Sequence, residues 1–291
     1  MAEREKTSSM LNLSDLKREA SHLKRNAERV FHRLRTPIRP DEMRSALDRL
    51  TEGGREIMFV HASLSTCGHF TAGPVDVLRG LGEFCDTLAF PTHTYCYPSS
   101  PAEAGPLFNR GTTPSKNGVL TEIFRTQTGA IRSIHATHSL AVSGALADEI
   151  CSDHHRHNTP CGASTPYSRL VQRRAAILLF GVTFHSYTLF HTAEDASGSE
   201  FAYERGTLDR LRVVDEIGQQ RVCWSRRQSR APRRFEEAGG LLERAGLARR
   251  ITLGRGDLLF VPDCSRVHDF LVERLEKVSD FLYQSCSSML T

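Results

Sequence analysis

Several features common in membrane and secreted proteins are missing from this sequence. No apolar run approaches the roughly 20 residues that a helix needs to cross a bilayer, and the first residues lack the apolar core of a secretory signal. The 8 cysteines are scattered singly and include no Cys-x-x-Cys pair, which is typical of reduced thiols rather than of a disulfide framework. These absences predict a cytoplasmic protein with no membrane partner.

An excess of one charge is also missing. The 38 basic and 34 acidic residues give a formal net charge of +4 and are largely interspersed. Proteins that bind nucleic acids usually concentrate basic residues on one face and add stacking aromatics, so we expect no nucleic-acid partner. What the chain does have is length, because 291 residues that are 39% hydrophobic can bury the core of one large domain or of two closely packed lobes.

Strand-like and helix-like segments alternate along the middle of the chain. The apolar runs that predict buried strands are 56–61, 87–91 and 176–182. The amphipathic segments that predict helices are 41–50 and 74–84. This alternation predicts an α/β fold with a largely parallel central sheet flanked by helices. Residues 92–115, rich in proline, serine and glycine, predict a long functional loop.

The C-terminal third has a different pattern. Residues 207–224 predict a β-hairpin around Gly218, residues 235–247 predict an amphipathic helix, and residues 254–262 predict a turn followed by a strand. We therefore expect a smaller antiparallel lobe of hairpin and helix here, with 207–262 partly on the substrate side.

Residues 1–36 form a basic, polar extension. Within it, apolar residues recur at alternating four- and three-residue steps, which predicts an amphipathic helix. These residues are Leu16, Ala20, Leu23, Ala27, Val30 and Leu34. The helix either packs on its own protein or forms a homodimer contact, and the sequence leaves both open.

His191 is the residue that points most directly to chemistry. It follows the apolar run 176–182, and the residues after that run share one helical face because Thr188, His191 and Glu194 recur at three-residue steps. A strand that ends and leads into a helix places such a face at the mouth of an α/β cleft, where ligands usually bind. A histidine beside a hydroxyl and carboxylates can accept a proton near neutral pH.

Six short blocks, in order along the chain, resemble the aminoglycoside 3-N-acetyltransferases, the antibiotic N-acetyltransferase family. The blocks lie at 59–65, 91–94, 122–125, 132–139, 160–166 and 181–194. The resemblance covers roughly residues 37–283 and implies that 37–291 is an acetyltransferase domain. It also implies acetyl-CoA as the donor and a primary amine of an aminoglycoside or related amino sugar as the acceptor.

Acetyl transfer to an amine needs a base, a donor for the oxyanion and a site for the thioester. His191 is the candidate base, and either Glu194, by local spacing, or Glu122, from another helix, is its candidate partner. Thr188, or backbone N–H groups, is the candidate donor to the thioester oxygen. The resemblance implies that the donor site is lined by His61, Ser63, Leu64, Ser65, Thr92, Arg132, Ser133 and His135.

Other interpretations remain open at this point. The first is an acyl-CoA-dependent N-acyltransferase of a natural-product or saccharide biosynthetic pathway. The second is a zinc-dependent hydrolase built on 151–161, although the spacing there matches no common zinc module, and we expect no metal. A catalytically inactive binding protein and a covalent mechanism through Cys67 are the others.

Two departures from the family pattern concern the acceptor. An acid often stands at the position of His185, and a small residue at that of Tyr187. The residues expected to supply an acidic wall for a polycationic acceptor are Asp195, Glu200, Glu204 and Asp209.

Overall fold

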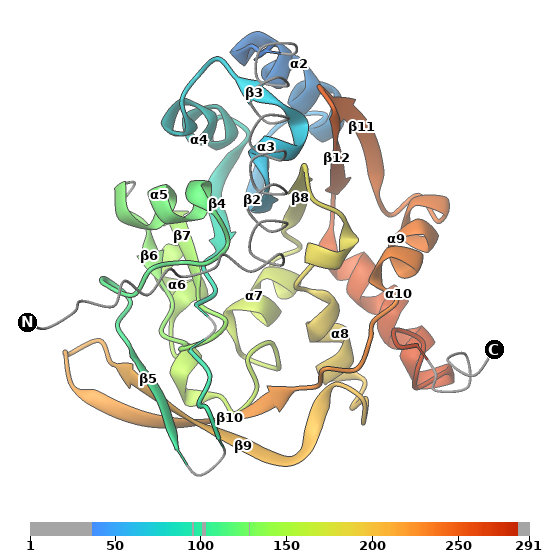
Figure 1. The fold of residues 1–291 in the computed structure, drawn as a ribbon. Helices are drawn as coiled ribbons and strands as arrows, with labels where there is room; N and C mark the ends of the chain where they lie inside the picture. The colour runs from blue at the N-terminus through green and yellow to red at the C-terminus, as the bar shows by residue number, and fades with distance from the viewer. Residues whose placement is uncertain (1–36, 95, 101–102, 128, 285–291) are drawn as a thin grey trace, which may run out of the picture.

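The computed structural model describes residues 37–284, except 95, 101–102 and 128 (Figure 1). The predicted amphipathic helix in 1–36, and the dimer contact expected of it, lie outside the described residues. Within the described ranges the chain forms one large sheet covered by helices on both faces, together with a smaller sheet along one edge.

The large sheet has seven strands in the order β11-β12-β8-β2-β4-β7-β6. Their bounds are β2 Arg55–Ala62, β4 Cys85–Pro91, β6 Ile131–Arg132, β7 Leu140–Gly144, β8 Ala176–Phe180, β11 Arg249–Leu253 and β12 Gly256–Val261. Only β8, β2 and β4 are mutually parallel, and the strands on either side of them pair antiparallel. The α/β class is confirmed, but the expectation of a largely parallel sheet is wrong. A tight turn of two residues joins β11 to β12, and residues 133–139 join β6 to β7, so the chain reverses direction at both places.

Successive side chains along the strands pack alternately into two hydrophobic cores, one on each face of the sheet. In β2, Ile57 and Phe59 face one core while Met58 and Val60 face the other, as the period of two in a strand requires. The helices on the first side are α6 Ala147–Cys151, α7 Pro166–Gln172, α8 Phe190–Ala196, α9 Phe235–Arg244 and α10 Cys264–Lys277. Those on the second side are α2 Pro40–Thr51, α4 Pro74–Gly82 and α5 Val119–Gln127. The sheet is therefore the middle of three layers.

The predicted β-hairpin is present and is longer than the sequence suggested. Strands β9 (Tyr203–Val214) and β10 (Gln220–Gln228) pair antiparallel, and β5 (Ala104–Phe108) adds to β9 in parallel. Figure 1 shows this three-stranded sheet running along the lower edge of the molecule. β5 comes from the segment expected to be a loop. The helix and strands expected to complete the lobe belong to the main layers instead, since β12 pairs with β8.

The three parallel strands end at the same edge of the sheet. β2 ends at Ala62, β4 at Pro91 and β8 at Phe180, so the loops that follow them lie together. Gly181 makes this possible after β8, because its φ is +67° and a Cβ there would lie 2.5 Å from the carbonyl oxygen of Ser63. This edge is where ligands bind in open α/β sheets.

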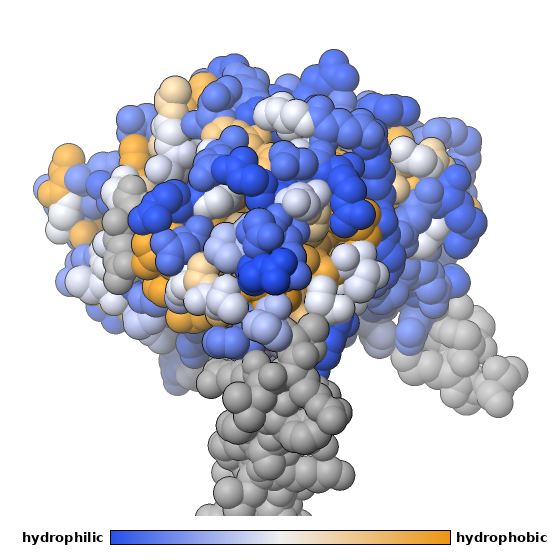
Figure 2. Space-filling model, turned by 90° about the horizontal axis from the view of Figure 1, so that it is seen from above, coloured by the Kyte–Doolittle hydropathy of each residue, from blue (hydrophilic) through white to orange (hydrophobic). Residues whose placement is uncertain are grey.

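The surface seen from above is mainly polar. Figure 2 shows hydrophilic residues over most of this face, with hydrophobic ones in small separate groups. None of the helices formed by the described residues is long and apolar enough to cross a membrane.

Candidate active site

A cleft of about 340 Å³ lies at the carboxyl ends of the three parallel strands. It is lined by residues from the loops after β2, β4 and β8, from the start of α5 and from the end of β10. They are His61, Ala62, Pro91, His93, Tyr97, Asn117, Thr121, His138, Val182, His185, Ser186, Tyr187, Thr188, His191 and Gln228. The volume is at the small end of the range for small-molecule sites.

His191 lies at the start of α8 and is paired with Glu194 one turn later. Its Nδ1 is 2.6 Å from Oε2 of Glu194, whose side chain is 1% exposed. The other oxygen of Glu194 accepts a hydrogen bond of 3.1 Å from Nε of Arg233, which lies between β10 and α9. The ring of Phe235 packs edge-on against the imidazole at 5.5 Å. The pair uses Nδ1, so Nε2 is the nitrogen of His191 that remains for a ligand in the cleft.

Glu194 is a buried carboxylate held in its charged form. Burial raises its pKa, but the charges of His191 and Arg233 and the hydrogen bonds to it outweigh burial, and the net pKa lies below the usual value. An ionised carboxylate in this position fixes the tautomer of the imidazole and stabilises its protonated form. Arg233 was not expected from the sequence, because it lies 39 residues from Glu194.

Glu122, the other candidate partner of His191, is placed elsewhere. Its Oε2 accepts hydrogen bonds of 2.7 Å from Nε of Arg125 and 2.7 Å from the backbone N–H of Ser115. It fastens the preceding loop to α5 and is not one of the described residues that line the cleft. The contact that the structure shows for His191 is the one with Glu194, and Glu122 as its partner stays a prediction. Its neighbour Thr121 lines the cleft instead.

Thr188 lies directly before α8, with a side chain that is 7% exposed and lines the cleft with His191. The two residues are also linked through the backbone, because the N–H of His191 donates to the carbonyl of Thr188 at 3.0 Å. The structure thus brings Thr188, His191 and Glu194 together, as their spacing predicted.

Four residues expected in the donor site are instead buried in a hydrogen-bonded network. Arg132 is 3% exposed and donates to Oγ1 and the carbonyl of Thr92, to Ser139 and to the carbonyl of Thr113. Ser133 and His135 are likewise buried, and the Oγ of Ser133 is 2.9 Å from Nδ1 of His154. Arg132 thereby braces the loop before α5. The expected contacts of Thr92, Arg132, Ser133 and His135 with a donor stay a prediction.

The short helix α3 (Leu64–Cys67) follows β2 and lines a groove. Leu64 and Ser65 line a groove of about 600 Å³ together with Gly73, Val119 and the exposed Arg255. Ser63 holds the loop in shape, since its Oγ lies 2.9 Å from Oγ1 of Thr66. A groove with hydroxyls, backbone N–H groups and a cation fits the phosphates of coenzyme A. Arg255 was missed because the sequence indicated only a turn.

The groove and the cleft are lined by neighbouring residues of the same two segments. After β2, Ala62 lines the cleft while Leu64 and Ser65 line the groove, and near the start of α5, Asn117 and Thr121 line the cleft while Val119 lines the groove. His61, at the end of β2, is 5% exposed and lines the cleft, and its Nε2 has no hydrogen-bond partner among the described residues. Burial lowers the pKa of His61 to about 3, so its ring is neutral.

The other chemistry considered from the sequence finds less support. Cys67 is buried, and burial with the charge of Asp257 raises the pKa of its thiol to about 12. In the segment 151–161, His154 is bonded through both ring nitrogens, to Ser133 and to the carbonyl of Pro160. No group of three or more His, Cys, Asp or Glu side chains in the described part of the chain could hold a metal ion.

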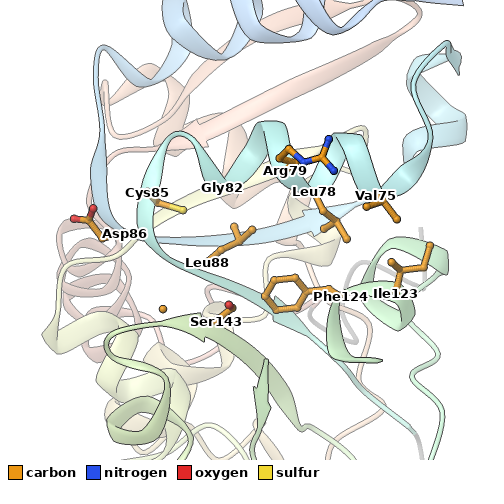
Figure 3. A pocket seen from close by; sticks show the side chains of 11 residues that line it. Val75, Leu78, Arg79, Gly82, Cys85, Asp86, Leu88, Ile123, Phe124 and Ser143 are labelled. Atoms are coloured by element: carbon orange, nitrogen blue, oxygen red, sulfur yellow. The ribbon is translucent and has the colours of Figure 1, made fainter. Parts of the chain in front are cut away.

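A second hollow of about 360 Å³ lies between α4, α5 and β4. Figure 3 shows Leu78, Leu88 and Phe124 around it. Its cysteine, Cys85, has a pKa that burial raises to about 12. Its lining is mainly apolar and includes no histidine among the described residues, so the cleft beside His191 is the candidate active site.

Known proteins share both the sequence pattern and the fold. A family model described as aminoglycoside 3-N-acetyltransferase matches residues 59–276. Aminoglycoside N(3)-acetyltransferase VII of Streptomyces paromomycinus is 28% identical over 248 residues, which make up 76% of this chain and 86% of the relative. The crystal structure of aminoglycoside acetyltransferase AAC(3)-Xa has a TM-score of 0.72 at 24% identity, and the match covers 90% of this chain and 98% of that one.

A structure described as AAC-IIIb binary with CoASH gives a TM-score of 0.71 at 20% identity, over 83% of this chain and 97% of that one. These solved structures share the fold, and the family model spans well over half of the sequence. The resemblance drawn from the six sequence blocks is thereby confirmed, and the chain belongs to the aminoglycoside 3-N-acetyltransferase family.

Proposed function

We propose that the protein is an acetyl-CoA-dependent N-acetyltransferase that acts on a primary amine of a small molecule, with His191 as the general base. The observation that carries this proposal is the contact of 2.6 Å between Nδ1 of His191 and the buried Glu194, inside a cleft at the carboxyl ends of three parallel strands. Family membership and a relative's structure with coenzyme A support acetyl-CoA as co-substrate.

Acetyl-CoA supplies an activated thioester carbonyl. Nε2 of His191 takes a proton from the amine as the amine nitrogen attacks that carbonyl, so that a C–N bond forms and the C–S bond breaks. The proton held by His191 then passes to the departing sulfur. Glu194 stabilises the imidazolium, and Arg233 keeps Glu194 in position. The hydroxyl of Thr188, or nearby backbone N–H groups, would donate to the carbonyl oxygen as it gains negative charge.

The donor would lie in the groove beside Leu64, Ser65 and Arg255, with the guanidinium of Arg255 near the phosphates. Because the loop after β2 borders both hollows, a pantetheine arm running past it would bring the thioester toward His191. Direct transfer between two bound substrates needs only this positioning.

The acceptor expected from the family is an aminoglycoside or related amino sugar. The alternative, an acyl-CoA-dependent N-acyltransferase of a natural-product or saccharide biosynthetic pathway, differs mainly in the acceptor. One observation favours this alternative, because the described residues that line the cleft include no carboxylate.

The proposal is tested by measuring thiol release from acetyl-CoA with a panel of amines. Replacing His191 by Asn should lower kcat by about 10²- to 10⁴-fold while the protein still binds coenzyme A. Replacing Glu194 by Gln should lower kcat, because the imidazolium that forms during the reaction loses its counter-charge. His268→Asn, on α10, is the matched control and should leave kcat unchanged. Full activity of His191→Asn would refute the assignment.

A further inference from the structure

The lining of the cleft carries no formal charge. The lining residues are histidines, tyrosines, hydroxyl and amide side chains and a few apolar residues, and no Asp, Glu, Lys or Arg is among those that the structure describes. A cation that leaves water needs a carboxylate or several oriented acceptors in exchange. An acceptor that carries a second ammonium group, besides the reacting amine, would therefore find no carboxylate in this lining.

Carboxylates on the surrounding elements are engaged by other groups. Four such carboxylates either were expected to form an acidic wall or belong to segments next to the cleft. They are Glu194 with His191 and Arg233, Asp195 with the hydroxyl of Tyr203, Asp209 with Arg227, and Glu236 with the backbone N–H of His185. None of the four residues expected to form an acidic wall, Asp195, Glu200, Glu204 and Asp209, is among the described residues that line the cleft.

The lining histidines do not supply an opposite charge either. His61, His93 and His138 are buried, and burial lowers the pKa of each, so these rings are neutral and would oppose a nearby cation if protonated. His138 is held in place by a contact of 3.1 Å between its Nε2 and Oε1 of Gln228. The wall formed by Gln228 is thus polar and uncharged.

The segment that carries Gln228 is basic. Residues 226–234 contain five arginines, at 226, 227, 230, 233 and 234, and no acidic residue. Arg227 pairs with Asp209 and Arg233 with Glu194, and Arg226 lies over the ring of Tyr203 at 4.2 Å. Arg234 also pairs with Glu237. The positive charge left on this segment is therefore that of Arg226 and Arg230, and it favours an acceptor with a negative group over one with several positive groups.

We propose that the acceptor is a small monoamine, whose body beyond the reacting amine is neutral or anionic, and not a polycationic aminoglycoside. This inference rests on the proposed acetyl transfer and narrows its substrate.

The first experiment compares three probes in the thiol-release assay. Glucosamine carries one amine on a neutral body, glucosamine 6-phosphate adds an anionic group, and kanamycin carries several amines. We expect kcat/KM for the better monoamine to exceed that for kanamycin by at least about tenfold, the factor that 1.4 kcal/mol represents. An equal or higher value for kanamycin would overturn the inference.

A binding measurement keeps this inference separate from the proposed function. With coenzyme A present, calorimetric titration should detect no kanamycin binding below millimolar concentrations. A micromolar Kd for kanamycin overturns the inference whether or not any amine is acetylated. Absent turnover with every amine, together with absent kanamycin binding, counts against acetyl transfer while leaving the uncharged cleft supported.

A substitution in the cleft wall gives the converse test. Gln228→Glu keeps an oxygen near His138 but adds a carboxylate, and Gln228→Asn is the matched uncharged control. We expect Gln228→Glu to tighten kanamycin binding by about tenfold at low salt, with the gain lost at high salt, and Gln228→Asn to leave it unchanged. No gain with Gln228→Glu, in a variant that still binds coenzyme A, contradicts the inference.

Discussion

Lowering the pH from about 7.5 to 5.5 should destabilise this protein strongly, because it folds around neutral histidines. Five of them are at most 7% exposed. They are His61, His93, His135, His138 and His154. Burial lowers the pKa of His61, His138 and His154 to about 3, and that of His93 and His135 well below the usual value. In the unfolded chain the same side chains titrate near the ordinary value of about 6.5.

The sign of the effect follows from proton binding. Between about pH 6.5 and the depressed values of the folded state, the unfolded chain binds more protons, so stability is present above this window and is lost as the pH falls through it. One unit below 6.5, each neutral histidine lowers the free energy of unfolding by about 1.4 kcal/mol. Five together give about 7 kcal/mol, which is comparable to the whole stability of a typical domain.

Urea unfolding followed by circular dichroism at several pH values measures this slope. His61→Gln should reduce the slope by about one fifth, since Nε2 of His61 has no hydrogen-bond partner among the described residues to lose and one titrating group is removed. The exposed His69 gives the matched variant, His69→Gln, which should leave the slope unchanged. A free energy of unfolding that stays level down to pH 5.5, or an unaltered slope in His61→Gln, would refute the reasoning.

Three further predictions concern the donor groove and the loop beside it. Arg255→Ala should raise KM for acetyl-CoA by about five- to tenfold with little change in kcat, and steady-state kinetics with an unchanged KM would contradict the placement of the phosphates. Cys67→Ser should keep its acetyl-transfer activity, because burial raises the pKa of the Cys67 thiol to about 12 and leaves it unreactive; loss of activity in a folded variant would favour a covalent route. Gly181→Ala should lower the free energy of unfolding by about 1–3 kcal/mol more than Gly246→Ala does. Both glycines have positive φ, but only at Gly181 would a Cβ meet the backbone of Ser63.

The centre of the fold could be predicted from the sequence because its strands are local patterns. Ile177 to Phe180 is a continuous apolar run that ends at a glycine, and such runs mark buried strands. The direction in which a strand runs beside its neighbours does not follow from such a local pattern. The run 258–261 has the same composition as β8, and only the two-residue turn at Gly254 and Arg255 indicates that β12 runs back along β11. β5 was missed because proline and glycine obscure its pattern.

The same distinction between local and distant contacts separates the parts of the site. His191 and Glu194 are three residues apart on one helix, so spacing alone brought them together. Arg233 reaches Glu194 from 39 residues away, and no sequence pattern could give that contact. The contact of Glu122 with Arg125 could have been predicted, because Arg125 stands at i+3 in the same helix.

The lack of charge in the cleft and the expected loss of stability in acid have the same cause, which is that neutral histidines are buried there without a carboxylate beside them. A single substitution should therefore change both properties. Gln228→Glu would place a carboxylate at the position where Oε1 now lies 3.1 Å from Nε2 of His138. A nearby negative charge favours the protonated imidazole, so the pKa of His138 in the folded state would rise from about 3 toward its unfolded value. The variant that binds a polycation more tightly should therefore also lose stability less steeply below pH 6.5, by up to one histidine's share of the slope. Gln228→Asn should alter neither property, and a change in only one of the two would show that the charge of the cleft and the titration of His138 are independent.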